Sequence, residues 1–468
     1  MSIKPSIERG NPFSWRFVTP LYMGSTLNPI NSSIIATALV PIALALHVAV
    51  AQVTWLVAVL YLASSVAQPT AGKLAEEFGP RRIFMAGIVM IFVAGVIGGV
   101  AHSLTWLVVS RILIGIGTST AYPSAMLLIR RRARAAHMTE PPGSVLGALQ
   151  IAALITPVVG LPIGGVLVDA WGWRTTFLVN LPFALVALGT ALLWIPRDEP
   201  IERKNSARDM AARIDVVGVL GFAATLTALL IFLFSLPQPK WMFLGSGVLL
   251  GMGLVGWELR VSRAFLDVRL LTVNRALTRT FARFGLLTFC VYTVLYGVTE
   301  WIGAARGMSS LATGLLLLPM SGLSAIVVGP VSKRNWIRGP LIVSAIASII
   351  ASMGVLWLTR NTSVAWIVVI TLLFGVTMGT MASGNQTALY TQVSSDYIGT
   401  ASGLFRTFGY LGSIASSALI SIVFHRGVSD AGLHHLAAIM IVASLGALII
   451  TVADRQLGSR AIEHSAAP

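Results

Sequence analysis

The residues most able to carry chemistry in this chain are ionisable side chains that lie inside long apolar stretches. Tyr292, Tyr296 and Glu300 are spaced by four residues, so on a helix they share one face. Burial disfavours the charged form of a carboxyl group, whereas a nearby cation such as Arg111 favours it. Glu300 is therefore a candidate for proton uptake and release. The alternative is an interfacial glutamate in an aromatic belt with Trp301.

Two arginines also fall within apolar stretches. Arg111 lies seven residues after Leu104, which is about 10 Å along a helix. An arginine at such a depth costs about 2.5–3.5 kcal/mol on insertion scales and usually faces a polar cavity, unless it snorkels to the interface. Arg406, one turn before Tyr410, either binds an anionic group in a cavity or reaches the cytoplasm. Three amides either line such a cavity or are satisfied by neighbouring helices: Gln150, Asn180 and Asn385.

Patterns for other chemistries are missing from the sequence. There is no Gly-x-x-x-x-Gly-Lys-Ser/Thr loop for ATP, and no Ser/His/Asp or Cys/His arrangement. Cys290 is the only cysteine, which excludes an internal disulfide. His434 and His435 are adjacent and do not make a metal site by themselves. We therefore expect neither an enzyme nor a bound metal or cofactor.

The elements that must position these residues are apolar stretches of membrane-spanning length. The chain is 56% hydrophobic and 11% charged, with a mean hydropathy of +0.83, whereas a soluble protein carries about 25% charged residues. A span needs about 20 apolar residues. We predict an all-α membrane protein with fourteen transmembrane helices at residues 20–46, 54–74, 83–101, 104–129, 144–169, 175–196, 214–236, 241–258, 283–302, 311–331, 340–358, 365–386, 400–424 and 433–453.

The cations predict the orientation of the chain. The net charge of +16 comes mainly from Lys and Arg in alternate connecting segments, as the positive-inside rule requires, and this placement argues against nucleic-acid binding. An even number of spans puts both termini in the cytoplasm. The longest polar stretches divide the chain into a cytoplasmic tail, a six-helix bundle, cytoplasmic loops with a two-helix insert, a second six-helix bundle and a second tail: residues 1–19, 20–196, 197–279, 280–453 and 454–468.

The segment that joins the second and third stretches carries the strongest local motif. Residues 72–82 read Gly-Lys-Leu-Ala-Glu-Glu-Phe-Gly-Pro-Arg-Arg. They resemble the loop signature of the major facilitator superfamily, in which such a cluster latches the cytoplasmic ends of two bundles. The alternative is a solvated turn that only sets the topology. The positions that carry the resemblance, and hence the expected cytoplasmic gate, are Gly72, Glu76, Gly79, Arg81 and Arg82.

Three further segments extend the resemblance over nearly the whole chain. The surroundings of Arg111 are similar to the second motif of the superfamily, whose arginine is linked to proton coupling. The run at 160–167 resembles the antiporter motif through Gly160, Pro162, Gly164 and Gly165. Residues 171–182 are similar to a segment of the fourteen-helix drug:proton antiporters. This resemblance implies export of a small compound rather than uptake.

The first predicted helix departs from that group. The fourteen-helix antiporters usually have an acid two residues before a threonine there, whereas this chain has Asn31 and Ser33. An amide hydrogen-bonds but releases no proton. The resemblance therefore leaves Arg111 and Glu300 as the candidates for proton coupling, and Asn31, Gln150, Tyr292, Tyr296, Asn385 and Arg406 as candidates for the substrate cavity.

The resemblance implies a major facilitator fold of two six-helix bundles around a central cavity, with two additional linker helices outside. Its expected partners are a small-molecule substrate, protons and membrane lipids, with the proton gradient as energy source and no cofactor. The expected location is the inner membrane of a bacterium. Uptake or uniport of a metabolite, lipid translocation, and a non-transporting receptor or enzyme are the alternatives. The sequence leaves open the substrate and the oligomeric state, for which a monomer is one option.

Overall fold

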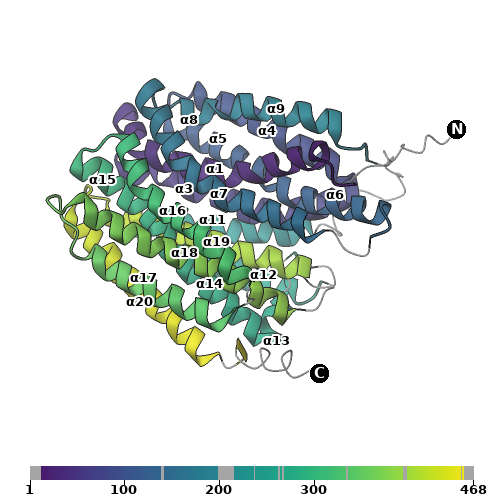
Figure 1. Cartoon of the computed structure of the whole chain (residues 1–468). Helices are drawn as coiled ribbons and strands as arrows, with labels where there is room; N and C mark the ends of the chain where they lie inside the picture. The colour runs from purple at the N-terminus through teal and green to yellow at the C-terminus, as the bar shows by residue number, and fades with distance from the viewer. Residues whose placement is uncertain are drawn as a thin grey trace.

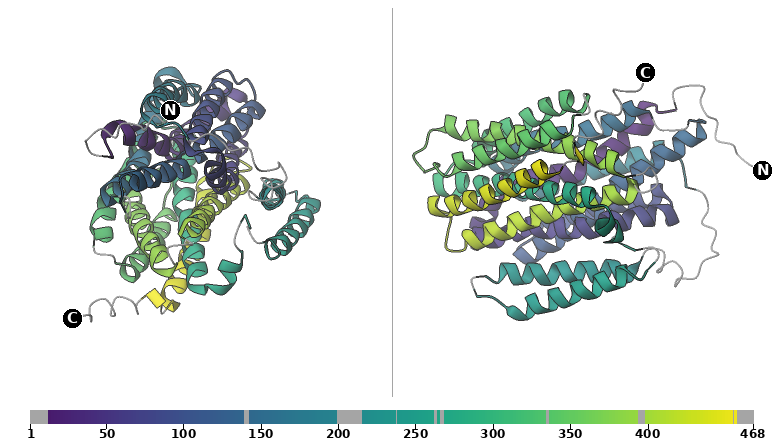
Figure 2. Two further views of the ribbon diagram at one scale, coloured as in Figure 1. Left: turned by 90° about the vertical axis from the view of Figure 1, so that its right-hand side faces the viewer. Right: turned by 90° about the horizontal axis from the view of Figure 1, so that it is seen from below.

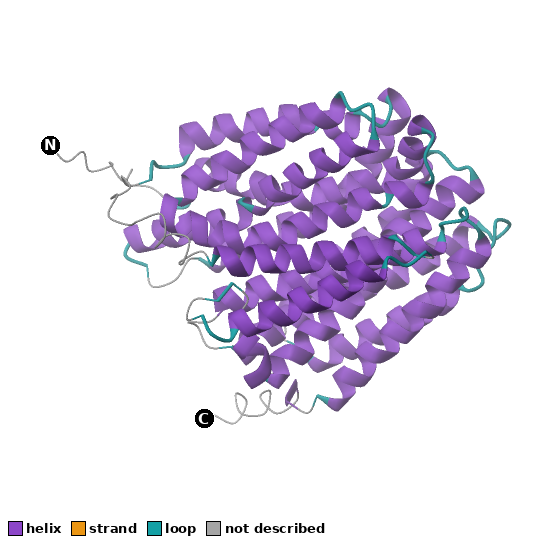
Figure 3. Ribbon diagram, turned by 180° about the vertical axis from the view of Figure 1, so that it is seen from behind, coloured by secondary structure: helices purple, strands orange, loops and turns teal. Residues whose placement is uncertain are grey.

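In the computed structural model, the described residues are 12–138, 142–198, 215–236, 238–261, 264–265, 268–333, 336–393, 398–454 and 456–457. Every regular element in this part of the chain is a helix (Figure 3). The helices run roughly along one common direction, and they form two groups that lie beside each other (Figure 1). This arrangement agrees with the predicted all-α class.

The first group, the N-terminal bundle, contains the helices up to residue 194. Within it, α1 packs on α7, α3 packs on α5, and α4 packs on both α5 and α9. Its elements are α1 (Trp15–Leu46), α2 (Val50–Val53), α3 (Trp55–Phe78), α4 (Pro80–Gly99), α5 (Leu104–Ser119), α6 (Ala121–Ala135), α7 (Gly143–Trp171), α8 (Thr175–Leu178) and α9 (Asn180–Trp194).

The second group, the C-terminal bundle, contains the helices from residue 275 onward. Here α16 packs on α18, α14 packs on α19 and α20, and α17 packs on α18 and α20. Its elements are α14 (Arg275–Thr293), the π-helical turn η1 (Val294–Val298), α15 (Thr299–Arg306), α16 (Ser310–Lys333), α17 (Arg338–Val355), α18 (Val364–Gln392), α19 (Ile398–Val423) and α20 (Asp430–Ala453). The bundles meet mainly through α7 against α16 and α3 against α19.

Between the bundles in sequence come α11 (Val216–Phe234), α12 (Trp241–Glu258) and the short α13 (Val268–Val273). The pair α11 and α12 forms a hairpin at the edge of the molecule (Figure 2). Helix α11 packs on α3 and α19, and most of the apolar surface of α12 is exposed. In a membrane this surface faces lipid, as expected for linker helices that pack outside the bundles.

The described helices include twelve stretches that are long and apolar enough to cross a membrane. Two more helices, α7 and α19, are 29 and 26 residues long but contain side chains outside the described set. Together these fourteen match the predicted ranges in order, and the spanning character of α7 and α19 remains a prediction. Prolines inside α1 and α16 do not end these helices, since neighbouring helices compensate for such breaks in a membrane.

Several boundaries differ from the predictions for identifiable reasons. The ninth helix begins at Arg275 rather than Arg283, because its first two turns are amphipathic and therefore invisible to a hydropathy criterion. The fourth and sixth predicted helices are each divided, at Thr120 and Val179. The turn between α3 and α4 uses Gly79 at φ +97°, a conformation that favours glycine, and Pro80 then starts α4.

Two ends of the molecule are named below. The basic end contains residues 79–82, 130–138 and 275–283, and the outer end contains residues 46–54, 99–104, 171–175 and 306–310 (Figure 1). The first turn of α1 and the last turn of α20 both lie at the basic end, which fits an even number of spans. The charge distribution predicts that the basic end faces the cytoplasm.

Candidate functional site

Glu300 lies where the C-terminal bundle meets the N-terminal bundle near the outer end. Its carboxyl group is fully buried. Oε1 accepts a 2.8 Å hydrogen bond from Thr54 Oγ1, which belongs to the other bundle, and Oε2 has no partner among the described residues. A buried charged carboxylate with incomplete hydrogen bonding is costly, so this position suits a carboxyl group that carries a proton while the two bundles are in contact.

Tyrosines from both bundles continue the contact toward the middle of the molecule. The hydroxyls of Tyr61 and Tyr296 are 3.2 Å apart, and Tyr296 also donates to the carbonyl oxygen of Ser32 over 3.3 Å. The ring of Tyr292 lies 5.6 Å from that of Tyr296 and 5.2 Å from that of Tyr61. All three polar residues predicted on this face of the ninth helix, Glu300 included, thus contact the N-terminal bundle.

A π-helical turn shapes this part of the ninth helix. Residues Val294–Val298 form η1, which contains Tyr296 and separates Tyr292 from Glu300. A π turn inserts an extra residue into the helical repeat, and such turns frequently occur at functional sites. The sequence carried no sign of it, because an extra residue in the helical repeat leaves the apolar character of the stretch unchanged.

Arg406 lies deep in the molecule and on the surface between the bundles. It is eight residues from the first residue of α19, or about 12 Å along the helix. Its guanidinium carbon is 4.1 Å from the ring centre of Tyr122 in the N-terminal bundle. Tyr410, one turn further, donates a hydrogen bond to Gln68 of that bundle. The head group of Arg406 thus points to the opposite bundle, which disfavours the alternative that it reaches the cytoplasm.

Arg111 is buried inside the N-terminal bundle. Nε donates to the carbonyl of Leu56 over 3.1 Å, Nη1 donates to the carbonyl of Asn31 over 3.3 Å, and Nη2 has no partner among the described residues. The side chain is 1% exposed, so it does not snorkel to the interface. No ion pair joins Arg111 to Glu300 in the described part of the chain. Arg111 instead contacts Leu56 in the first turn of α3, and Glu300 contacts Thr54, the residue before α3.

Asn31 forms a reciprocal pair with Asn180. Each amide donates to the other, over 2.8 Å and 3.0 Å, and their remaining recorded bonds go to the carbonyls of Leu27 and Phe177. Both side chains are buried. The structure therefore places these two amides in a contact between α1 and α9, directly beside the backbone that Arg111 binds, rather than on the surface between the bundles.

The glycines of the predicted antiporter motif allow α7 to approach helices on both of its sides. A β-carbon at Gly164 would lie 2.9 Å from Ile34 Cα in α1, and one at Gly165 would lie 2.6 Å from Leu311 Cα in α16. Gly160 is similarly close to Ser33. Helix α7 continues through Pro162 without a break. The motif thus builds close packing of α7 on α1 within the N-terminal bundle, and, through Gly165, close packing on α16 of the C-terminal bundle.

Asp169 completes this contact at the outer end. Its two carboxylate oxygens accept hydrogen bonds from the backbone N–H groups of Ser310 and Leu311, over 3.1 Å and 2.9 Å. These groups are at the N-terminus of α16, where helices leave N–H groups unpaired and attract negative charge. A residue of the N-terminal bundle therefore caps a helix of the C-terminal bundle.

At the basic end, the predicted gate motif binds within its own bundle. Asp198, which follows α9, accepts hydrogen bonds from the backbone N–H groups of Arg81 and Arg82 over 3.3 Å and 2.9 Å. It also pairs with Arg131 at 3.4 Å. Glu76, the acid of the predicted gate motif, is exposed, and Asp198 is the acid that accepts these bonds. The reason is geometric: Asp198 faces the first turn of α4, and Gly79 leaves room for it.

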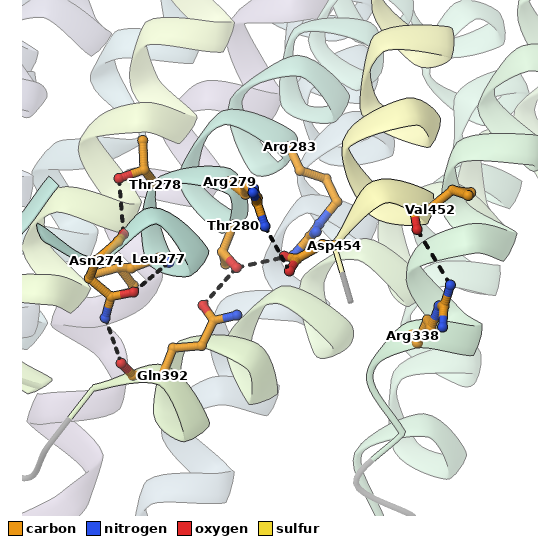
Figure 4. A network of polar contacts seen from close by, with 10 residues as sticks. All are labelled: Asn274, Leu277, Thr278, Arg279, Thr280, Arg283, Arg338, Gln392, Val452 and Asp454. Atoms are coloured by element: carbon orange, nitrogen blue, oxygen red, sulfur yellow. Dashed lines mark hydrogen bonds and ion pairs between the residues drawn. The ribbon is translucent and has the colours of Figure 1, made fainter. Parts of the chain in front are cut away.

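Asn385 belongs to a buried polar network at the basic end of the C-terminal bundle. Figure 4 draws Arg283 and the other members of this network, without Asn385. Oδ1 of Asn385 accepts a 2.9 Å hydrogen bond from Nε of Arg283, whose side chain is fully buried. Arg279 forms an ion pair with Asp454 at 3.3 Å, and Thr280 connects Arg283 to Gln392. The network joins the ends of α14, α18 and α20. The remaining cavity candidate, the side chain of Gln150, lies outside the described residues.

Comparison with known proteins agrees with this architecture. The family model of the Major Facilitator Superfamily matches residues 21–417. The chain belongs to the major facilitator superfamily. It is 33% identical over 442 residues to the uncharacterized MFS-type transporter YwoD of Bacillus subtilis, covering 93% of this chain and 96% of that protein. It is 28% identical to the tetracenomycin C resistance and export protein of Streptomyces glaucescens, over 90% of this chain and 78% of that protein.

Solved structures confirm the major facilitator fold independently of sequence. The crystal structure of the nucleoside transporter NupG superimposes with a TM-score of 0.63, covers 93% of this chain and 98% of that one, and shares 12% of its residues. At that identity the likeness concerns the fold alone. This member of the superfamily is thus a membrane transporter built from two helical bundles and an insert.

Several residues of this facilitator's site escaped the sequence analysis. Thr54 and Tyr61 are ordinary polar residues of an apolar helix, and only their contacts with the other bundle mark them. Asp169 and Asp198 stood at the ends of apolar stretches, where acids are common. A usable signal existed for Arg283: it follows Arg275 and Arg279 at a spacing of four, which places three cations on one helix face.

Proposed function

We propose that this protein exports a small organic compound from the cell in exchange for protons, by alternating access. The observation that carries the proposal is Glu300, a fully buried carboxyl group at the contact between the bundles. Separation of the bundles at the outer end would break its bond to Thr54 and expose it to water. Protonation and the bundle contact are therefore coupled at one residue.

The direction of transport is supported by the relatives and by the packing of α7. The relative from Streptomyces glaucescens is named a resistance and export protein. The glycines at 160, 164 and 165 allow α7 to contact α1 and α16 closely, and small residues of this kind let helices slide or rock against each other in lipid. A hinge or sliding contact at this place suits a transporter that opens at the outer end to release its substrate.

The conformation is that of a facilitator closed at the outer end. The recorded hydrogen bonds between the bundles involve Glu300, Tyr296 and Tyr410, together with the cap formed by Asp169. They extend from the middle of the helices to the outer end. At the basic end, the gate motif binds Asp198 of its own bundle. In alternating access the outer contacts would open and the basic ends would come together.

The proton gradient supplies enough energy for export. One proton driven by about 100 mV contributes about 2.3 kcal/mol, and each pH unit adds about 1.4 kcal/mol. Together they support a concentration ratio of a few hundredfold for a neutral substrate.

The test begins with a growth screen. A host that lacks its own pumps expresses this chain and is challenged with a broad panel of toxic compounds, with and without an uncoupler. A compound found in this way is then followed in proteoliposomes that contain purified wild-type protein or the Glu300→Gln variant. We expect an imposed pH gradient to accelerate transport only in the wild type, while substrate exchange without a gradient persists in both.

A matched control separates loss of coupling from loss of structure. Asp430 is another acid of the C-terminal bundle near the outer end, where it accepts hydrogen bonds from Trp301 and Arg360. The Asp430→Asn variant should keep the response to the gradient. Full gradient-driven export by Glu300→Gln would remove Glu300 from the mechanism.

Uncoupled uptake or uniport is the second candidate, and one observation favours it. The position of the usual acid in the first helix holds Asn31, whose amide is engaged with Asn180 and releases no proton. Under this alternative, transport in proteoliposomes would be unchanged when the proton gradient is collapsed, and substitution of Glu300 would affect only stability.

A further inference from the structure

We propose that the surface between the bundles binds an aromatic anion, that is, a planar ring that carries a carboxylate or phenolate group, with Arg406 as its counter-charge. The inference deepens the proposed function and rests on it only for the direction of movement. It follows from the distribution of charge inside the helices, from the aromatic rings around Arg406, and from the exposure of these side chains.

The charge distribution excludes an acidic partner for Arg406 within the helices. Of the 17 acidic residues, only Glu300 lies inside a spanning helix and more than five residues from its ends. Its carboxyl group is fully buried and bound to Thr54. The other two arginines at comparable depth, Arg111 and Arg283, are buried inside one bundle each. In the described part of the chain, the charge presented at mid-depth between the bundles is therefore the positive charge of Arg406.

The rings around Arg406 provide a platform for a planar molecule. The guanidinium group lies over Tyr122 at 4.1 Å. Tyr410, one turn away on α19, has its ring centre 5.6 Å from that of Tyr61, and Tyr61 meets Tyr292 edge to face at 5.2 Å. Rings at such spacings already contact one another, so another aromatic ring would pack against their outer faces and edges rather than between them.

The arrangement leaves part of each of these side chains uncovered. Arg406, Tyr122, Tyr292 and Tyr410 are each partly exposed, although they lie far from the helix ends and contact or adjoin the opposite bundle. Their exposed parts therefore face the space between the bundles. The guanidinium group of Arg406 hydrogen-bonds to the hydroxyls of Tyr122 and Tyr410. A bound carboxylate would share or replace these bonds, and its two oxygens match the planar N–H groups of an arginine.

The same features disfavour a cationic ligand. A cation placed on these tyrosines would face Arg406 with no carboxylate to offset the repulsion, in a region of low dielectric constant. The acid that would attract a cation, at the position of Asn31, is absent, and the amide there is engaged with Asn180. We therefore expect discrimination by charge between molecules of equal shape.

The experiment uses matched probes with the purified full-length protein. Naphthalene-2-carboxylate and 2-naphthylmethylammonium share one ring system and differ in the sign of their charge, and benzoate and anthracene-2-carboxylate with their ammonium counterparts extend the series. Binding is measured by equilibrium dialysis without any gradient. We expect at least one carboxylate to bind tenfold or more tightly than its ammonium counterpart. The Arg406→Gln variant should lose about tenfold in affinity for it, and Arg406→Lys should recover part of that loss.

A control arginine distinguishes this role from a structural one. Arg174 also stacks on a ring, at 4.4 Å over Trp173, and donates to the carbonyl of Ala101 within the N-terminal bundle. The Arg174→Gln variant should bind the carboxylate like the wild type. Equal or stronger binding of the ammonium probes, unchanged binding by Arg406→Gln, or binding of no carboxylate in the series would overturn the inference.

The outcomes also separate this inference from the proposed function. Selective binding of a carboxylate that no proton gradient can move would refute proton-driven export and leave the anion site standing. Gradient-driven export of cationic compounds, without binding of any carboxylate, would support export and refute the anion site.

Discussion

Asp169 offers a direct test of how the two bundles are held together at the outer end. Its carboxylate accepts two backbone hydrogen bonds from Ser310 and Leu311, at 3.1 Å and 2.9 Å, across the boundary between the bundles. Because these bonds exist only when α7 and α16 are in contact, the Asp169→Ala variant should weaken the closed state and leave an open state unaffected. The population would then shift toward opening at the outer end.

The size of the shift follows from the capping geometry. Replacement of an N-cap aspartate by alanine costs about 0.5–2 kcal/mol. Asp169 is exposed, which places the expected cost in the lower half of that range. A cost of about 1 kcal/mol corresponds to a change of about fivefold in the ratio of open to closed molecules.

Pulsed electron-electron resonance between two spin labels measures this ratio. Ala170 in α7 and Ala304 in α15 are exposed and lie in different bundles near the outer end. Labels at cysteines in these positions require the background Cys290→Ser, since Cys290 is the only native cysteine. When Asp169→Ala is introduced into this labelled background, the ratio of long to short label distances should increase about fivefold.

The control is Asp430, which also accepts two hydrogen bonds near the outer end, but from Trp301 and Arg360 of its own bundle. Asp430→Ala removes a comparable number of bonds without touching the contact between the bundles, so the distance distribution should stay as it was. If Asp169→Ala changed the ratio by less than twofold, or if Asp430→Ala changed it equally, the cap across the bundles would not control opening.

Two further predictions concern the close contacts. Gly165→Val should force α7 away from Leu311, with a cost of about 1–3 kcal/mol and a shift of the same labels toward long distances, whereas Gly189→Val, with open space around it, should do neither. Asp198→Ala should lower the thermal stability in detergent by the cost of a lost cap, about 0.5–2 kcal/mol, whereas Glu76→Ala should not. An equal loss of thermal stability in both variants would show that Glu76 contributes to capping α4 as much as Asp198 does.

Much of the architecture could be predicted because the bilayer imposes it. A backbone in lipid must satisfy its own hydrogen bonds, so each long apolar stretch becomes a helix, and all fourteen predicted ranges coincide with helices. The error at Arg275 arose where this reasoning does not apply, in an amphipathic turn that extends beyond the apolar stretch. The division at Thr120 and the π turn at 294–298 leave the apolar character unchanged and had no signal.

The candidate site could be predicted only as a set of residues. The sequence showed that Glu300 and Arg406 lie inside spans, because an ionisable residue in an apolar stretch is conspicuous. It could not show that Glu300 meets Thr54, 246 positions away, or that Arg111 binds backbone carbonyls instead of Glu300. Such pairings depend on which faces of distant helices meet, and hydropathy says nothing about that.

The sequence alone determined that this protein is a helical membrane protein of the facilitator type, since composition and local motifs specify the solvent and the order of the spans. The tertiary structure decided which polar groups act together. It assigned the capping of α4 to Asp198 rather than Glu76, paired Asn31 with Asn180, and placed Arg406 against Tyr122 of the other bundle. The physical reason is that hydrogen bonds and ion pairs act over a few ångströms, and only the packing of the two bundles brings their partners within that range.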